Sequence, residues 1–186
     1  VEYVVVNSLQ EEVDNPLSTE GQSVAYTNYS GDGGVGIGSF FRRLGFALRY
    51  SELNLLISNQ LSDDSKLIME RNVVSRVKKA APFLYTDNDP YLALIEGNLF
   101  WIIDMYTVSD KYPYAQPADT RRINENSGLP LNFNYLRNSV KAVVNAYDGT
   151  LNFYVVDEND PLIATYNDIF PNLFSPKSSM SSDLLD

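Results

Sequence analysis

The chain has 186 residues, a formal net charge of −10, and neither cysteine nor histidine. This length is enough for a domain with a real core, and 44% hydrophobic with 20% charged residues is typical of a globular protein. Without cysteine, disulfides and thiol nucleophiles are excluded; without histidine, so are the usual general base at neutral pH and most transition-metal sites. We therefore expect no cofactor and no metal centre, and any metal ion would need oxygen ligands alone.

The negative charge is unevenly distributed along the sequence. Residues 42–79 hold eight basic and four acidic side chains, whereas all other positions together hold six basic and twenty acidic ones. The overall acidity argues against nucleic acid as a partner. The basic stretch predicts a helical layer docked on an acidic sheet, and an anion-binding face is the alternative.

The first part of the chain is predicted to contain short strands followed by helices. Residues 3–6 and 24–29 favour strands, and the segment between them is polar and predicted to be a loop. Helical spacing of apolar residues predicts a helix from Ile37 onward. A second helix is predicted to start at residues 62–64, to bury Leu67 and several valines, and to end before the proline at position 82.

A glycine-rich segment, residues 31–38, leads into the first helix, whose first turns carry Arg42 and Arg43. Free N–H groups at a helix start, together with two arginines, could bind a phosphate or another anion. The spacing fits neither a P-loop nor a dinucleotide-binding fingerprint. A flexible or closely packed connector is the favoured interpretation, and the anion site is the alternative.

Residues 91–103 are predicted to form the central β-hairpin of a sheet, since two apolar runs flank a turn signal. Gly97-Asn98 suits a two-residue loop because both positions tolerate positive φ. That loop would pair Ile95 with Phe100, and a loop one residue earlier would shift the pairs. Both faces of the hairpin are apolar in either register, so we expect it to be covered on both sides.

A second hairpin is predicted at Asp148-Gly149, a type I′ turn signal that would pair Val144 with Phe153 on the side facing the core. Further on, Asp160-Pro161 predicts a helix with aspartate as the N-cap and proline in its first position.

The expected fold class is therefore α+β: an antiparallel sheet built from hairpins, with the basic helices of residues 37–80 packed on one face. We expect a single domain over residues 1–176 and a flexible acidic tail over residues 177–186. The chain begins at Val1 inside a strand-like run, so we expect it to be a segment of a longer protein.

The main catalytic candidates are Asp104 and Asp110, which lie among tyrosines. Two carboxylates flanked by aromatic rings could serve a carboxylate-based hydrolase or a carbohydrate-binding site. The neighbouring aromatic candidates for ligand binding are Tyr106, Tyr112 and Tyr114. The favoured interpretation is structural: a strand end where aspartate caps a turn and the tyrosines shield the sheet edge.

Two acidic segments, residues 87–89 and 157–160, could be considered as oxygen-only metal sites. Neither has the EF-hand spacing, and both lie where turns are required, so turn formation is favoured. Residues 28–30 form a glycosylation sequon, a pattern that often occurs by chance.

Several strings of the sequence resemble an uncharacterised family of large bacterial membrane proteins found in actinobacteria and cyanobacteria, among others. They are GSFFRRL at 38–44, APFL at 81–84, DPYL at 89–92, WIID at 101–104, YT at 106–107, SD at 109–110, YPY at 112–114, NSVK at 138–141 and AYDGT at 146–150. The resemblance covers about residues 3–175. It implies tethering to the cell membrane through transmembrane segments outside this chain, with this part outside the cytoplasm. No catalytic residues are established for the family, so none is carried over.

We therefore expect a non-catalytic, extracytoplasmic interaction or ligand-binding domain of a multi-pass membrane protein. The expected partners are the remainder of the same protein, and envelope proteins or polysaccharide. The candidate ligand-binding residues are Tyr106, Tyr112, Tyr114, Arg42 and Arg43. A hydrolase or carbohydrate-binding site at Asp104 and Asp110 remains the rival hypothesis.

Overall fold

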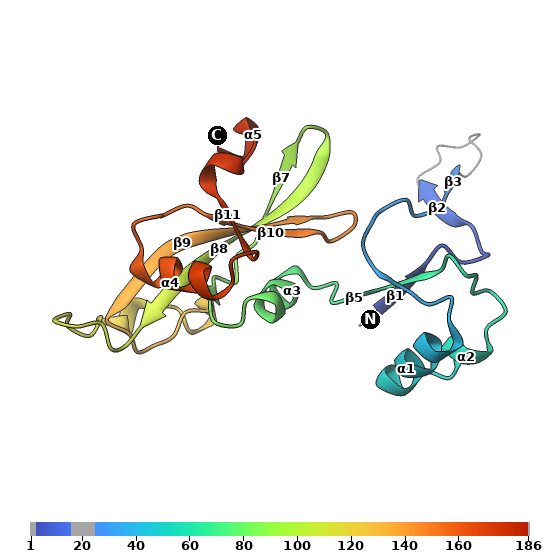
Figure 1. The fold of residues 1–186 in the computed structure, drawn as a ribbon, viewed down its shortest axis with the longest axis horizontal. Helices are drawn as coiled ribbons and strands as arrows, with labels where there is room; N and C mark the ends of the chain where they lie inside the picture. The colour runs from blue at the N-terminus through green and yellow to red at the C-terminus, as the bar shows by residue number, and fades with distance from the viewer. Residues whose placement is uncertain (1–2, 16–24, 186) are drawn as a thin grey trace. The chain divides into compact units, whose positions relative to one another are not determined.

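The computed structural model describes residues 3–15 and 25–185 (Figure 1). The chain divides into two compact units, Val1–Arg71 and Asn72–Asp186, and each has a hydrophobic core of its own. The predicted α+β class is confirmed, since helices and mainly antiparallel sheets make up the described residues. The single domain predicted over residues 1–176 stays a prediction.

The first unit contains a three-stranded antiparallel sheet. Strands β1 (Tyr3–Val6) and β4 (Val35–Gly36) pair with the central strand β5 (Lys66–Met69). A separate ladder joins β2 (Glu12–Asn15) to β3 (Ala25–Thr27), so β2 is a strand where a loop was predicted.

Two helices complete the core of this unit. They are α1 (Phe40–Tyr50), which confirms the first predicted helix, and the short α2 (Asn54–Ile57). The most buried side chains of this core are those of Ile37, Ala47, Leu55 and Leu67. The helices of the first unit thus pack in a core that they share with β5.

The prediction of a helix starting at residues 62–64 was wrong for the first half of that segment. The hydroxyls of Ser62 and Ser65 donate to the carbonyl of Asn7, at 3.0 and 2.8 Å, instead of capping a helix. Helix α3 (Val73–Ala80) starts later because Asn72 is its N-cap, accepting the Ser75 amide at 2.9 Å. Its last turn carries two lysines, as expected for the negative end of a helix dipole.

The second unit is organised around a six-stranded sheet in the order β11-β10-β9-β8-β6, with β7 pairing the other end of β8. All pairs are antiparallel except β10 with β11. The strands are β6 (Tyr85–Thr86), β7 (Tyr91–Ile95), β8 (Asn98–Ser109), β9 (Tyr135–Asn145), β10 (Leu151–Val155) and β11 (Phe174–Pro176).

Helices lie against one face of this sheet, but of the basic helices over residues 37–80 that were predicted there, only α3 does, because α1 and α2 belong to the core of the first unit. Helix α3 contributes Val77 to the core, and α4 (Pro161–Ile169) contributes Ile163. From the strands come Ile103, Met105, Val140, Ala142, Val144, Phe153, Val155 and Phe174. Because side chains alternate along a strand, the residues between these point to the opposite face.

The first hairpin forms, but in the register that was not favoured. Its loop is Glu96-Gly97, with φ of 50° and 81°, so Ala93 rather than Ile95 pairs with Phe100. The prediction that the hairpin is covered on both sides was also wrong, since Leu94 is 70% exposed near its tip.

The second hairpin has a longer turn than the two-residue loop predicted. The Asn145 side chain accepts the Tyr147 and Asp148 amides, at 2.8 and 3.3 Å, and Phe153 pairs with Ala142 instead of Val144. A shift of two residues leaves every side chain on its predicted face, so Phe153 is still in the core.

The predicted helix at Asp160-Pro161 is confirmed as α4, with Asp160 accepting the Leu162 amide at 2.9 Å. Between β8 and β9, the predicted loop holds only the short 3₁₀ turns η1 (Thr120–Arg122) and η2 (Glu125–Ser127). The C-terminal segment contains η3 (Lys177–Ser179) and α5 (Ser182–Leu185). Within the described ranges, no helix combines the length and apolar character needed to cross a bilayer.

Candidate functional site

The glycine-rich segment uses its arginines to hold its own backbone. Arg43 donates to the carbonyls of Ile37 and Ser62 at 2.7 and 3.3 Å, and Arg42 donates to Gly36 at 3.2 Å. A Cβ on Gly38 would lie 2.5 Å from the carbonyl oxygen of Asp63. This arrangement agrees with a closely packed connector, because Arg43 is turned inward and is not presented to an anion beside Arg42.

Asp104 and Asp110 are not brought together. Asp104 lies in the middle of β8, and Asp110 follows the end of the same strand. Six residues of extended chain separate their Cα atoms by about 20 Å, well beyond the spacing of a glycosidase pair. The strand end predicted near these two aspartates lies at Ser109, directly before Asp110, and β8 runs on past Asp104.

The three candidate tyrosines have different surroundings and do not form a cluster around Asp104. Tyr112 stacks on Tyr135, with ring centroids 4.3 Å apart, and Tyr114 is fully exposed with a φ of 61°. Tyr106 lies on β8 opposite Tyr85. Only Tyr106 is therefore near Asp104.

The structure does assemble charged groups around Asp104, on the sheet face opposite the helices. Asp104 pairs directly with Lys141 of β9, whose Nζ lies 2.6 Å from the Asp104 Oδ1, and the two side chains are 22% and 29% exposed. The same Nζ donates to the Tyr91 hydroxyl at 3.4 Å. With Tyr106 and Asp87, these groups define what we call the polar sheet face: Asp87, Tyr91, Asp104, Tyr106 and Lys141.

Asp87 is the least satisfied member of this face. Its backbone amide donates to the Asp104 carbonyl at 3.2 Å, so Asp87, which directly follows β6, lies beside Asp104 of β8. Its Oδ1 is buried and has no hydrogen-bond partner among the described residues. Burial, and then the charge of Asp104, raise the pKa of Asp87 above its ordinary value.

The pKa values of the other ionisable groups of the polar sheet face depend on the same neighbours. Burial, and then Asp87 and Asp104, raise the pKa of Tyr106. For Lys141, burial acts to lower the pKa, but the hydrogen bond and charge of Asp104 outweigh it and raise the pKa. Lys141 is thus held as a cation between Asp104 and a tyrosine.

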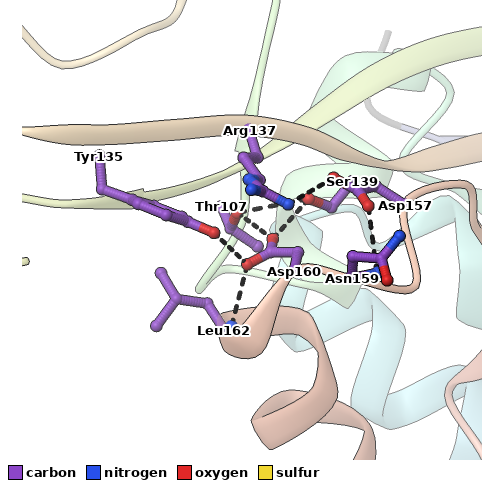
Figure 2. A network of polar contacts seen from close by, with 8 residues as sticks. All are labelled: Thr107, Tyr135, Arg137, Ser139, Asp157, Asn159, Asp160 and Leu162. Carbon is purple, nitrogen blue, oxygen red and sulfur yellow. Dashed lines mark hydrogen bonds and ion pairs between the residues drawn. The ribbon is translucent and has the colours of Figure 1, made fainter.

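A second carboxylate, Asp160, is completely buried at the start of α4 (Figure 2). Tyr135 donates to its Oδ1 at 2.6 Å, and Ser139 and Thr107 donate to its Oδ2, the former at 2.5 Å. With the Leu162 amide, four donors surround the carboxylate. They come from β8, β9 and α4, so Asp160 ties the helix to the sheet.

The pKa values of this network follow from its hydrogen bonds. Burial acts to raise the pKa of Asp160, but the bonds from Ser139, Thr107 and Tyr135 outweigh it and lower the pKa. Burial, and then the bond to Asp160, raise the pKa of Tyr135, so its hydroxyl stays protonated as a donor. Beside the network, Arg137 pairs with Asp157 at 2.9 Å near the surface (Figure 2).

The sequence did not reveal either cluster. Asp160 was predicted as a helix cap, but its other partners lie 21 to 53 positions away in the chain. The pairing of Lys141 with Asp104 was not predicted, because nothing in the sequence indicated that β8 pairs with β9. Across the described ranges, no three carboxylate, histidine or cysteine side chains gather as they would around a metal ion.

Comparison with known proteins shows relatives over the full chain. The profile of the uncharacterised protein family UPF0182 matches residues 1–186. A UPF0182 protein of Trichodesmium erythraeum is 48% identical over 98% of this chain, and one of Pelotomaculum thermopropionicum is 44% identical over 98%. The chain spans only 20% and 18% of these two relatives. No solved structure matches the chain.

Proposed function

The chain belongs to the uncharacterised protein family UPF0182, and from this premise we propose that it is a non-catalytic interaction domain of a larger protein. Its relatives are about five times as long, so most of each relative lies outside the region matched by this chain. The remainder of the same polypeptide is the partner that we propose, bound through the polar sheet face.

The observation that carries this proposal is the buried Oδ1 of Asp87, which has no partner among the described residues and lies beside the Asp104–Lys141 pair. A buried acceptor without a partner costs free energy, and a donor supplied from outside would recover it. Tyrosine is enriched at interaction surfaces because it offers a large apolar ring and a hydroxyl. The helices named above pack on the opposite face, so this one is not covered by α3 or α4.

We further propose that the domain lies outside the cytoplasm, tethered by membrane segments in the remainder of the protein. The support is the resemblance of its motifs to multi-pass membrane proteins. Because the chain has no cysteine, a Gln116→Cys variant in the exposed loop gives this domain a single thiol, and any cysteine in the remainder of the longer protein is first replaced by serine. Whole cells expressing the longer protein should react with a membrane-impermeant maleimide, and reaction only after lysis would contradict this location.

A second candidate is a carboxylate-based hydrolase in which Asp87 replaces Asp110 as the partner of Asp104. It is favoured by one observation: the pKa of Asp87 is raised by burial and by Asp104, as for the acid of a catalytic pair. Wild-type protein that hydrolyses a panel of aryl glycosides, with activity lost in both Asp87→Asn and Asp104→Asn, would establish it over the binding role.

The binding role is tested by mixing this domain with the purified remainder of the longer protein. Asp104→Asn breaks the ion pair with Lys141 and should weaken binding about tenfold, the effect of one charge-assisted hydrogen bond. Asp157→Asn, which breaks the surface pair with Arg137, is the matched control. Equal affinity for wild type and Asp104→Asn would contradict the proposal.

A further inference from the structure

Helices α1 and α2 of the first unit expose an unusual amount of apolar surface. Five large side chains in this short stretch are between 62% and 80% exposed, although α1 and α2 each also bury a residue in the core. They are Phe40, Phe41, Leu48, Leu53 and Ile57. A concentration of this kind is typical of a surface that contacts another apolar phase.

Helix α1 carries a strip of positive charge beside these apolar residues. Helix α1 contains three arginines and no acidic residue. Arg42 and Arg49 are both exposed and lie seven positions apart, which is two helical turns, so they share one side of the helix. Phe41 and Leu48 have the same spacing and lie on the adjacent side.

A hollow lies between the two arginines. Gly45 is one turn from each, and a Cβ at this position would meet no atom within 4 Å. The hollow has a volume of about 590 Å³ and is lined by α1, including Phe46, and by residues 34–36, which include β4. Arg42 uses one Nη to hold the Gly36 carbonyl at 3.2 Å. Its other N–H groups donate to none of the described residues and can bind an anion.

From these observations we propose that α1 and α2 dock on the surface of an anionic phospholipid bilayer. Phe40, Phe41 and Leu48 enter the boundary between headgroups and acyl chains, while Arg42 and Arg49 bind phosphates from the hollow. Aromatic and leucine side chains next to arginines on one short helix match the chemistry of such a surface. This contact is separate from the polar sheet face and does not depend on it.

Co-sedimentation of the 186-residue chain with vesicles of 70% phosphatidylcholine and 30% phosphatidylglycerol tests this proposal. We expect binding to these vesicles, at least tenfold weaker binding to pure phosphatidylcholine, and weakening when the salt is raised from about 0.1 to 0.5 M. An Arg42→Gln, Arg49→Gln double variant should bind about 25-fold more weakly, from roughly fivefold for each cation. A Phe41→Ser, Leu48→Ser double variant should lose most of its binding.

Two controls keep the test specific. An Arg121→Gln, Arg122→Gln variant removes an equal charge from the exposed η1 turn, and Leu94→Ser removes an equally exposed leucine from the hairpin; both should bind like wild type. Circular dichroism checks that each variant folds. If the Phe41→Ser, Leu48→Ser variant does not fold, the Arg42→Gln, Arg49→Gln variant alone tests the proposal.

Several outcomes would overturn the proposal. If the chain binds neither kind of vesicle, the apolar surface of α1 and α2 contacts another protein surface and not lipid. An equal loss of vesicle binding in the Arg121→Gln, Arg122→Gln control would mean that the chain is held by nonspecific electrostatic attraction to the anionic vesicles. If the wild-type chain sediments as a dimer, the serine double variant sediments as a monomer and neither binds vesicles, this surface mediates self-association.

Discussion

Two carboxylates of the second unit, Asp160 and Asp104, are held in opposite ways. Asp160 is fully buried and accepts four hydrogen bonds, which come from two strands and a helix. Asp104 is partly exposed, shares one lysine with a tyrosine, and has the unsatisfied Asp87 beside it.

The difference separates a structural role from a binding role. A carboxylate whose acceptor positions are filled has no capacity for a ligand, and it stabilises the elements that supply its donors. A half-buried pair with an unsatisfied neighbour can still gain hydrogen bonds when a partner arrives. Breaking each cluster in turn should therefore give different results.

The largest effect is expected for Asp160→Ala. It removes the N-cap of α4 and leaves buried hydroxyls of Thr107 and Ser139 without their acceptor, so we expect a loss of about 3 to 5 kcal/mol in the free energy of unfolding. Urea denaturation measures it. The matched Asp157→Ala variant should cost less than about 1 kcal/mol, and similar losses in both would contradict a structural role for the network.

The same residue should make stability depend on pH. Because hydrogen bonds lower the pKa of Asp160 in the folded state, its stabilisation is fully present above the ordinary aspartate pKa of about 3.9 and is lost as pH falls through the lower folded value. The stability gap between wild type and Asp160→Asn should therefore shrink on acidification. A gap that is constant from neutral pH down to about pH 2 would show that Asp160 is not ionised in the fold.

A smaller effect on stability is expected for Asp104→Asn. Its pair with Lys141 is partly solvated, so we expect a loss of about 1 to 2 kcal/mol, between the values for surface and buried pairs. A cost as large as that of Asp160→Ala would mean that Asp104, like Asp160, is part of the structural framework.

The smallest change, of opposite sign, is expected for Asp87→Asn. Because burial and Asp104 raise the pKa of Asp87, its ionised form lowers stability at neutral pH and its protonated form does not. The variant should be more stable than wild type at pH 7 by less than about 1 kcal/mol, and the difference should vanish in acid. Destabilisation at pH 7 would indicate that Asp87 has a stabilising partner.

Much of the fold could be predicted from local patterns. Both hairpins, helix α1 and the Asp160-Pro161 helix start follow from side-chain alternation, helical spacing and capping chemistry. The registers could not be predicted, because a shift of one or two residues changes the turn while keeping apolar runs together. At the second hairpin, side-chain hydrogen bonds of Asn145 set a longer turn than Asp148-Gly149 suggested.

The candidate site was only partly predictable. Asp104 and Tyr106 were identified because acidic and aromatic residues cluster in the sequence, but Asp110 was paired with Asp104 on proximity along the chain. Two residues six positions apart in a strand lie far apart in space, since each residue advances the chain by about 3.3 Å. The real neighbours, Asp87 and Lys141, come from other strands, and only the pairing of β8 with β6 and β9 brings them close.

Hydroxyl-radical footprinting of tyrosines tests the proposed binding face most directly, by comparing this chain alone with the same residues inside the longer protein. Tyr91, which is 46% exposed and bonded to Lys141, should be oxidised at least fivefold more slowly in the longer protein, while the fully exposed Tyr114 should keep its rate. Equal oxidation of Tyr91 in both proteins would contradict the proposal that the polar sheet face binds the remainder of the polypeptide.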